Sequence, residues 1–447
     1  MSLKKVLILG AGRSTFSLID YLSNKASELD IEILVVDREA VKNSGFHPNS
    51  KASFFDSDLG DDSIRQKLIA VSDLVISMLP ARFHLGVAQD CINFGKDMVT
   101  ASYVTEEMQA LDNEAKIAGI TILNEVGLDP GIDHMSALKI IQEIQGDGGR
   151  IKVFESFTGG LLAPESEKDN PWQYKFTWNP RNVVMAGSGG AVKFIDNGMY
   201  KYIPYHKLFR RSEIINLHEY GKFEGYANRD SLTYRSLYGL DDVQTMFRGT
   251  LRRPGFCKGW DVFVQLGLTD DSFEMENINT MTNRSFLNSF LKYHPTDSVE
   301  LKLMQYLKLY QDDVDIMEKL EWLDLFKEDK IELEKGSPAK ILQSILEKKW
   351  KLKDEDKDMI VMWHRFIFEK DGVEGEIHSS MVVEGDDQNK TAMAKTVGYP
   401  LAMAAELILT EVFKEKGVHR PLNKSLYLPI LDKLKSFDIN FTEEKIR

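Results

Sequence analysis

The first 125 residues alternate short apolar runs with longer amphipathic stretches. The apolar runs are Lys5–Leu9, Ile31–Val36, Ala52–Phe55, Leu74–Ser77, Asp97–Thr100 and Ile120–Asn124. Between them, FSLIDYLSNKASEL and TEEMQALDNEAKIAG space their apolar residues by three and four positions, and Thr105 and Gly119 suit the two ends of the second helix. This alternation predicts an α/β domain with a doubly wound parallel sheet and crossover helices.

Polar or glycine-rich residues follow each predicted strand. They are Gly10–Gly12, Asp37–Arg38, Asp56, Met78–Leu79–Pro80, Ser102–Tyr103 and Glu125–Asp129. The carboxyl ends of parallel strands share one edge of a sheet, and ligands bind along that edge. The sequence therefore predicts a ligand-binding cleft there, and we expect Asp56, Met78, Leu79 and Pro80 to contact a cofactor.

The first turn, in VLILGAGRST, resembles a dinucleotide-binding turn without its third glycine. Gly10 permits a tight bend, and Gly12 lets the backbone approach a pyrophosphate at a helix N-terminus. Thr15 stands in place of the third glycine, and Arg13, Ser14 and Thr15 are possible phosphate donors. We predict that this turn binds a nicotinamide dinucleotide, although a purely structural bend is the alternative.

The end of the second strand bears on the choice of cofactor. Asp37 lies where a carboxylate accepts hydrogen bonds from the adenosine ribose. Its neighbour Arg38 is suited to a 2′-phosphate or to stacking on adenine. The sequence therefore allows either NAD or NADP as the cofactor and slightly favours NAD.

The segment NEVGLDPGIDH joins the sixth strand to a helix that reaches about Gln145. Asp129 suits the N-cap and Pro130 the first helical position. The helix N-terminus at the same sheet edge is able to receive a substrate carboxylate. Asp133 and His134 are interpreted as helix residues packed against a neighbouring element.

Beyond Gly149 the pattern changes. RIKVFESFTGGLLAPE predicts a strand leading into a glycine loop, and further strands are expected through Leu268. Residues 288–350 are helical and poor in strands, 359–385 form a β-hairpin, and an alanine-rich segment is helical after Pro400 and packs on the first domain. The arginines of the middle region are either carboxylate ligands or surface groups: Arg229, Arg248, Arg252 and Arg253.

Composition narrows the class of protein. The 447 residues carry a net charge of −13, which argues against a nucleic-acid partner. The two cysteines, Cys91 and Cys257, are far apart and predict neither a disulfide framework nor a zinc site. No apolar run suits a signal sequence or a membrane span, so we expect a soluble protein of the reducing cytosol, with no membrane partner and no metal.

Several blocks, in order along the chain, resemble the saccharopine reductase family, the glutamate-forming saccharopine dehydrogenases and their relatives. The blocks are LVISMLP, VTASYVTEEMQALDNEAKIAGITILNEVGLDPGIDHMSA, TGGLLAPES, NPWQYKFTW, GYANRDS, RGTLR and TAMAKTVGYPLAMAAELIL. The resemblance implies reversible oxidation of saccharopine with NAD(P), giving glutamate and 2-aminoadipate 6-semialdehyde. It also implies a homodimer and a small-molecule substrate with several carboxylates.

The resemblance further implies a division into domains and a set of site residues. Residues 1–125 with about 393–425 form a Rossmann dinucleotide domain, 126–287 with about 355–392 a second α/β substrate and dimerisation domain, and 288–354 a small all-helical insert. Tyr103 and Asp129 are the catalytic candidates, and Ser102 and Leu128 join the cofactor site. The implied substrate-binding residues are Ser102, Tyr103, Asp129, Arg229, Arg248, Gly249 and Thr250.

One departure from the family pattern concerns the glycine loop. The family commonly has YCGGLPAPE where this chain has Phe157, Thr158 and Leu162. A mechanism that needs a thiol cannot operate at Thr158, and the stretch from 200 to 226 also differs. A carboxynorspermidine dehydrogenase-like enzyme and a catalytically silent dinucleotide-binding scaffold therefore stand as alternatives.

Overall fold

The computed structural model describes residues 3–43, 45, 47, 50–186, 190–217, 219–228, 230–310 and 313–447. The chain divides into two compact units. The first comprises Met1–Arg150, Lys370–Gly372 and Met381–Glu443, and the second comprises Ile151–Glu369, Val373–Ser380 and Glu444–Arg447. Each unit contains segments that are distant in the sequence. The three-domain division with a separate helical insert stays a prediction.

The first unit is built on a parallel sheet, which confirms the predicted α/β fold class. Within the described residues its strand order is β15-β6-β5-β4-β1-β2-β3. The strands are β1 (Lys4–Leu9), β2 (Ile31–Asp37), β3 (Ala52–Asp56), β4 (Leu74–Ser77), β5 (Asp97–Thr100), β6 (Thr121–Leu123) and β15 (Gly417–His419). The six strands expected from the apolar runs are all present. Only β15, which pairs with β6 through Val418 and Ile122, was not predicted.

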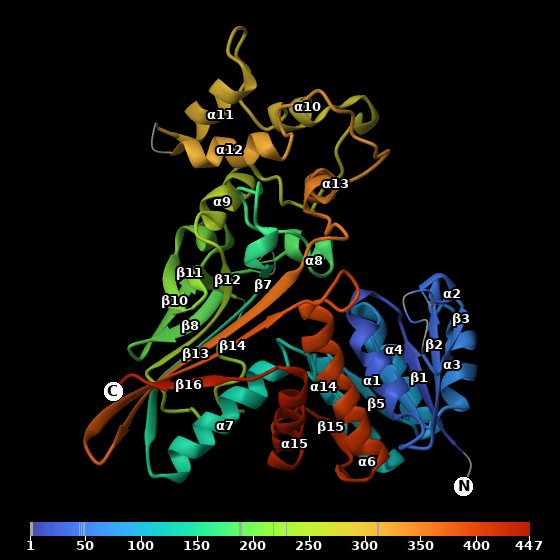
Figure 1. Cartoon of the computed structure of the whole chain (residues 1–447). Coiled ribbons are helices and arrows are strands. Elements are labelled where there is room, and N and C mark those ends of the chain that lie inside the picture. The colour runs from blue at the N-terminus through green and yellow to red at the C-terminus, as the bar shows by residue number, and fades with distance from the viewer. Residues whose placement is uncertain are drawn as a thin grey trace. The chain divides into compact units, whose positions relative to one another are not determined.

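The helices of the first unit come from both its N-terminal part and the far C-terminal end of the chain (Figure 1). They are α1 (Phe16–Lys25), α2 (Ala40–Asn43), α3 (Asp62–Ala70), α4 (His84–Phe94), α5 (Glu106–Ala110), α6 (Asp112–Ala118), α7 (Ile132–Gly146), α14 (Ala392–Leu409) and α15 (Lys424–Leu434). The helix expected over 105–119 is divided at Leu111 into α5 and α6, and Thr105 and Gly119 cap its two ends.

Helix α14 packs on the first unit, as its apolar composition predicts, but it begins earlier than expected. Thr391 caps it through the Ala394 amide, and Pro400 lies inside the helix. A Cβ on Gly398 would lie 2.6 Å from the Leu18 nitrogen, so the absence of a side chain allows α14 to approach α1. The Glu406 carboxylate accepts hydrogen bonds from Tyr21 Oη on α1 at 2.5 Å and pairs with Lys433 Nζ on α15 at 2.8 Å.

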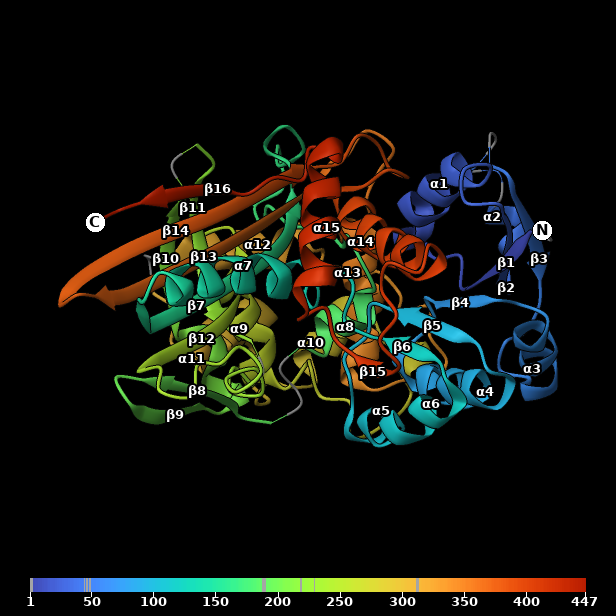
Figure 2. The ribbon, with the colours of Figure 1, turned by 90° about the horizontal axis from the view of Figure 1, so that it is seen from below.

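The second unit is built on a mixed sheet, seen from a second side in Figure 2. Within the described residues its order is β10-β11-β12-β7-β13-β14-β16, with β8 and β9 attached to β12. The strands are β7 (Arg150–Leu162), β8 (Val192–Asp196), β9 (Met199–Ile203), β10 (Ser212–Leu217), β11 (Gly221–Ala227), β12 (Thr245–Arg252), β13 (Asp358–Lys370), β14 (Val373–Glu384) and β16 (Thr442–Lys445). The hairpin of β13 and β14 confirms the expectation for 359–385.

Two expectations for this region were wrong. The glycines near 159 do not form a loop, because β7 continues through them; a Cβ on Gly159 would lie 2.5 Å from the Leu251 carbonyl oxygen of neighbouring β12. The segment before Leu268 is not a strand but helix α9 (Phe256–Leu266). Its apolar residues fit helical spacing as well as a buried strand.

An aromatic core lies between the sheet of the second unit and its helices. Trp172 and Trp350 have ring centroids 5.2 Å apart, and Tyr174 lies 5.0 Å from Trp350. Each such pair contributes about 0.5–1.5 kcal/mol beyond its buried area. The helices are α8 (Pro180–Val184), α9, α10 (Asn283–Asn288), α11 (Val299–Leu307), α12 (Val314–Trp322) and α13 (Pro338–Trp350).

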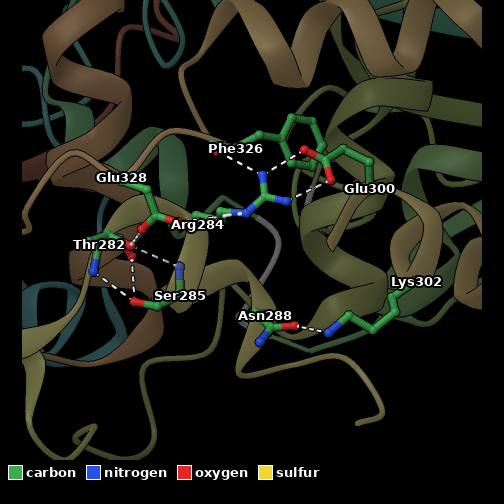
Figure 3. Close-up of polar contacts among 8 residues, drawn as sticks. All are labelled: Thr282, Arg284, Ser285, Asn288, Glu300, Lys302, Phe326 and Glu328. Atoms are coloured by element: carbon green, nitrogen blue, oxygen red, sulfur yellow. Dashed lines mark hydrogen bonds and ion pairs between the residues drawn. The ribbon is translucent and has the colours of Figure 1, made fainter. Parts of the chain in front are cut away.

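A polar cluster stabilises the helical segment of this unit (Figure 3). The Arg284 guanidinium donates to both oxygens of Glu300, at 2.6 and 2.9 Å, and to the Phe326 carbonyl at 3.0 Å. Lys302 Nζ donates to Asn288 Oδ1 at 2.5 Å. These bonds join α10 to α11 and to the segment after α12, so the strand-poor region expected from the sequence is an ordered helical array.

Among the described residues, no helix combines the length and apolar character needed to cross a membrane. The same part of the chain contains no group of three or more histidine, cysteine, aspartate or glutamate side chains that could hold a metal ion. Both cysteines are free and buried, and burial raises the pKa of each thiol.

Candidate functional site

The glycine turn after β1 has the shape that a dinucleotide requires. Gly10 has φ +104°, and a Cβ there would lie 3.0 Å from the Met78 carbonyl group. Gly12 is different, because a Cβ there would meet no atom within 4 Å. The short helix Arg13–Thr15 starts next to this space without a side-chain cap. Its N-terminal end therefore suits a phosphate, with Ser14 and Arg13 beside it.

Thr15, which stands at the position of the third glycine, forms a hydrogen bond within the turn. Its Oγ1 donates to the Gly12 carbonyl at 2.5 Å, and its side chain is buried. The hydroxyl thus stabilises the turn and is already used in the protein. The close approach of a neighbouring element to α1 depends instead on Gly398 of α14, a glycine that is not part of the fingerprint.

Asp37 ends β2 beside the turn. Its Oδ2 accepts from the Ala11 amide at 2.9 Å, and its Oδ1 accepts from the Glu39 amide at 3.3 Å. Asp56, the neighbour in register on β3, accepts from the Val41 amide at 2.8 Å. Both carboxylates therefore organise the backbone where the adenosine half of a dinucleotide would lie.

Arg38 lies at the rim of the same edge. Its guanidinium pairs with Asp58 at 3.1 Å, and the two side chains are 70% and 58% exposed. Exposed pairs of this kind are weak, at about 0–1 kcal/mol. Breaking this pair therefore costs little free energy.

The predicted residues after β4 are positioned by the turn. The Met78 amide donates to the Leu9 carbonyl at 2.8 Å, Leu79 packs on the apolar core of the first unit, and Pro80 precedes a short helix leading into α4. His84, the first residue of α4, contacts Ser77 Oγ through Nδ1 at 3.0 Å and Ser102 Oγ through Nε2 at 2.6 Å. His84 was not among the site residues predicted from the sequence.

The two catalytic candidates lie together. Tyr103 Oη donates to Asp129 Oδ1 at 3.3 Å, and both side chains are half-buried. Leu128 is buried, and its carbonyl accepts from the Asp133 amide at 3.1 Å. The structure thus places Ser102, Tyr103 and Asp129 in two short loops that follow β5 and β6.

The predicted cap of α7 was wrong. The helix begins at Ile132 with Gly131, not Asp129, at the N-cap, and Pro130 precedes the helix. Gly131 has φ +147°, and a Cβ there would lie 2.1 Å from the Gly127 carbonyl oxygen. The Asp133 carboxylate accepts from the Gly131 amide at 2.6 Å. The Asp129 side chain instead accepts from Tyr103 Oη.

A buried carboxylate anchors this loop. Glu125 has a positive φ of 60°, and its Oε1 accepts from the Val104 amide at 2.8 Å and from Arg420 Nε at 3.1 Å. Its Oε2 lies 3.1 Å from His134 Nε2. Burial opposes the charge of Glu125, but His134, the Val104 amide and Arg420 hold its pKa below the usual range. His134 is thus packed against a neighbour as expected, with a charged partner that was not foreseen.

The predicted substrate-binding residues of the second unit lie on β12, except Arg229, which is outside the described residues. Arg248 is buried, with its guanidinium 4.7 Å from the centre of the Tyr234 ring. Gly249 leaves room for the Phe157 ring, and Thr250 is the register partner of Thr158 on β7. The Thr158 hydroxyl is buried without a hydrogen-bond partner among the described residues.

The other two arginines have different environments. Arg253 pairs with Glu167 at 2.6 Å and donates to the Tyr220 carbonyl, so it is a structural group. Arg252 is buried, donates to the Leu251 carbonyl and lies 4.8 Å from the Tyr174 ring centre.

Comparison with known proteins adds independent findings. Residues 6–123 match the family model of the saccharopine dehydrogenase NADP binding domain, and residues 127–439 match the saccharopine dehydrogenase C-terminal domain. The chain is 34% identical over 438 residues to saccharopine dehydrogenase [NADP(+), L-glutamate-forming] of Saccharomyces cerevisiae, covering 97% of each chain. It is 34% identical to the mitochondrial alpha-aminoadipic semialdehyde synthase of Bos taurus, covering 99% of this chain and 48% of that protein.

Solved structures agree with these matches. The apo saccharopine dehydrogenase (L-Glu forming) from Saccharomyces cerevisiae superimposes with a TM-score of 0.88 at 33% identity, covering 99% of this chain and 100% of that one. Homospermidine synthase from Legionella pneumophila in complex with NAD gives a TM-score of 0.59 at 10% identity and shares the fold alone. The comparisons do not support the expected slight preference for NAD over NADP, because the matching family model and the yeast relative are both named for NADP. Asp37 accepts from the Ala11 and Glu39 amides, and the Arg38 guanidinium pairs with Asp58.

Proposed function

This chain belongs to the saccharopine dehydrogenase family, and we propose that it is an oxidoreductase of lysine metabolism acting on the CH–NH bond of saccharopine. The reaction is saccharopine + NADP⁺ + H₂O, giving glutamate, 2-aminoadipate 6-semialdehyde, NADPH and H⁺, and it is reversible. One observation carries the proposal. Ser102, Tyr103 and Asp129 lie at the same sheet edge as a turn open to a pyrophosphate, in a chain alike over its whole length to the yeast enzyme.

A nicotinamide dinucleotide fits the open side of the turn. Gly12 and the start of the Arg13–Thr15 helix would hold its pyrophosphate, and Asp37 would face its ribose. Arg38 supports NADP as the cofactor, because its exposed pair with Asp58 is easily exchanged for a 2′-phosphate. The cofactor, when bound, accepts a hydride from the carbon next to the substrate nitrogen.

The protein supplies orientation and proton transfer. Loss of hydride from saccharopine leaves an imine, which water must attack before the C–N bond breaks. Asp129, with Tyr103 Oη at 3.3 Å, is positioned to take a proton from that water or to manage the proton on nitrogen. Tyr103 orients the carboxylate by donating to it.

Saccharopine carries three carboxylates, which need cationic or hydrogen-bonding partners. Arg248 and the Gly249–Thr250 segment are the candidates in the described part of the second unit, and Arg229 is the candidate beyond it. Arg248 is buried, with its guanidinium over the Tyr234 ring, and a guanidinium offers the two parallel N–H groups that bind a carboxylate in bidentate fashion. We further propose that the chain works as a homodimer.

The test is a direct assay of the purified protein with saccharopine and either NADP or NAD. Reduction of NADP, followed by its near-ultraviolet absorbance and by detection of glutamate, would support the proposal. Turnover with a diamine-derived adduct instead would favour a carboxynorspermidine dehydrogenase-like enzyme. Dinucleotide binding without turnover of either substrate would favour a silent scaffold.

A further inference from the structure

A line of three hydrogen-bonding side chains runs from the first sheet to the candidate catalytic loop. Ser77 ends β4 and is fully buried, His84 is 4% exposed, and Ser102 follows β5 with a half-buried side chain. The imidazole bridges the two hydroxyls, with Nδ1 3.0 Å from Ser77 Oγ and Nε2 2.6 Å from Ser102 Oγ. Among the described residues, Ser77 Oγ has no other hydrogen-bond partner.

The backbone of Ser102 is already fixed on both sides. Its amide donates to Thr100 Oγ1 at 3.3 Å, and its carbonyl accepts from the Glu125 amide at 3.1 Å. The remaining freedom of the residue is the rotation of its hydroxymethyl group. The contact with His84 restricts that rotation.

The direction of the two bonds follows from the burial of Ser77. A neutral imidazole has one N–H donor and one acceptor nitrogen. A buried hydroxyl needs an acceptor for its proton, and Nδ1 is the acceptor that the structure offers to Ser77. His84 then carries its proton on Nε2 and donates it to Ser102 Oγ, so the Ser102 proton points elsewhere.

We propose that His84 is a positioning residue that fixes the Ser102 hydroxyl as a hydrogen-bond donor to a carbonyl or carboxylate oxygen of a bound ligand. The inference rests on the proposed function, because that oxygen belongs to the nicotinamide carboxamide or to saccharopine. Both groups offer the same acceptor chemistry at the strand edge. The ligand whose affinity changes in the variants identifies which of them is bound.

The environment of His84 keeps this arrangement constant over the working pH range. Burial lowers the pKa of His84 to about 4, so the ring is neutral near pH 7. A neutral ring holds a single N–H, and the need of the Ser77 hydroxyl for an acceptor places that N–H on Nε2. Protonation would place a donor on both nitrogens and remove the acceptor for Ser77.

Two amide substitutions separate the two contacts. In His84→Gln the side-chain amide reaches toward the position of Nε2, whereas in His84→Asn it reaches only toward Nδ1. We expect Ser102→Ala and His84→Asn each to lower kcat/KM about tenfold, the size of one neutral hydrogen bond, and His84→Gln to retain activity to within about threefold. The double variant H84N/S102A should be no worse than Ser102→Ala alone.

The same cycle is measured on the NADP dissociation constant, which needs no turnover. A parallel loss in NADP affinity assigns the acceptor to the nicotinamide, and a loss confined to the saccharopine KM assigns it to the substrate. ¹⁵N NMR of the histidine rings supplies a readout independent of any ligand: the His84 signal, assigned by its absence in His84→Gln, should show the Nε2–H tautomer and should change in Ser77→Ala.

Additive losses in H84N/S102A, or an Nδ1–H tautomer in the wild type, would overturn the proposal, since His84 would then act through packing alone. A wild-type protein that binds NADP but does not oxidise saccharopine would instead defeat the proposed function. In that case the tautomer still decides the orientation of Ser102. Circular dichroism checks that each variant is folded, and Ser77→Ala provides the second test if His84→Asn is not.

Discussion

Glu125 is the residue whose replacement most directly tests how the catalytic loop is held. Glu125→Gln keeps the size of the side chain and the backbone at φ +60°, but it removes the charge. The Val104 amide retains an acceptor oxygen. Arg420 shares that oxygen and also keeps its acceptor. The new amide group takes the place of Oε2 and would present a donor to His134 Nε2, which lies 3.1 Å from the present carboxylate.

The magnitude follows from burial. The Glu125 and His134 side chains are 1% and 0% exposed, and Arg420 is 16% exposed. Removing one partner of a buried charge pair costs about 3–5 kcal/mol. Arg420 also donates to Gln109 Oε1 at 3.0 Å, and the Asp133 carboxylate stays near His134. His134 therefore loses only one of its polar partners, and Arg420 loses only the charge of one. We therefore expect a loss near the lower end, about 3 kcal/mol in the free energy of opening this region.

The effect should depend on pH with a defined sign. The folded-state pKa of Glu125 is lowered, because the contacts with His134, the Val104 amide and Arg420 outweigh the opposing effect of burial. A lowered carboxyl pKa gives stability that is complete above the unfolded value, about 4.3, and is lost as the pH falls through the folded value. The difference between wild type and Glu125→Gln should thus be largest near pH 7 and should shrink below about pH 4.

Hydrogen exchange of the β6 and α7 amides, measured over increasing urea, reads this opening directly. Tryptophan fluorescence reports the other unit, because the six tryptophans all lie there: Trp172, Trp178, Trp260, Trp322, Trp350 and Trp363. Glu28→Gln is the matched control, since its pair with Lys25 is exposed and should cost under about 1 kcal/mol. A loss in Glu125→Gln no larger than in this control would refute the reasoning.

Three further predictions concern the cofactor and the catalytic pair. Gly12→Ala should leave thermal stability unchanged, because its φ of −74° suits alanine, but it should weaken NADP binding at least about tenfold. Gly10→Ala, at φ +104°, should instead lower the free energy of unfolding by about 1–3 kcal/mol. Equal NADP affinities for wild type and Gly12→Ala would contradict this prediction. Arg38→Ala should weaken NADP by about 1.5–3 kcal/mol and leave NAD unchanged in titrations; an unaltered preference would remove Arg38 from the phosphate site. Tyr103→Phe should lower kcat/KM and alter its pH profile, and a profile identical in shape would exclude a proton role for Tyr103.

The sheet of the first unit could be predicted because its signals are local. Each strand is an apolar run that ends in a polar turn, and all six expected strands are present. The glycine turn was also local: the φ of Gly10 and the space at Gly12 are what a tight turn beside a phosphate needs. The same reasoning predicted that Ser102, Tyr103 and Asp129 lie at one edge of the sheet, because they follow the adjacent strands β5 and β6.

The errors occurred where a distant contact decides the local conformation. Asp129 and Pro130 suit a helix start, but the chain instead passes Gly131 against Gly127, and the helix begins after that contact. Gly159 favours a loop in isolation, yet it lies in β7 because Leu251 of β12 occupies the space of a side chain. Pro400 suggests a helix start, but the cap at Thr391 lies nine positions earlier.

The missed site residues share a further property: each acts on a residue that is far away in the sequence. His84 supports Ser102, and Arg420 supports Glu125. A lone histidine at a helix start is most often a packing residue, so no sequence pattern distinguishes His84 from that case. Its two hydroxyl partners do distinguish it, because burial leaves Ser77 with one acceptor and thereby fixes which nitrogen donates to Ser102. The orientation of a hydroxyl in the candidate site is thus set by a residue at the end of a neighbouring strand, and the effect of changing Ser77 on the tautomer of His84 is its direct consequence.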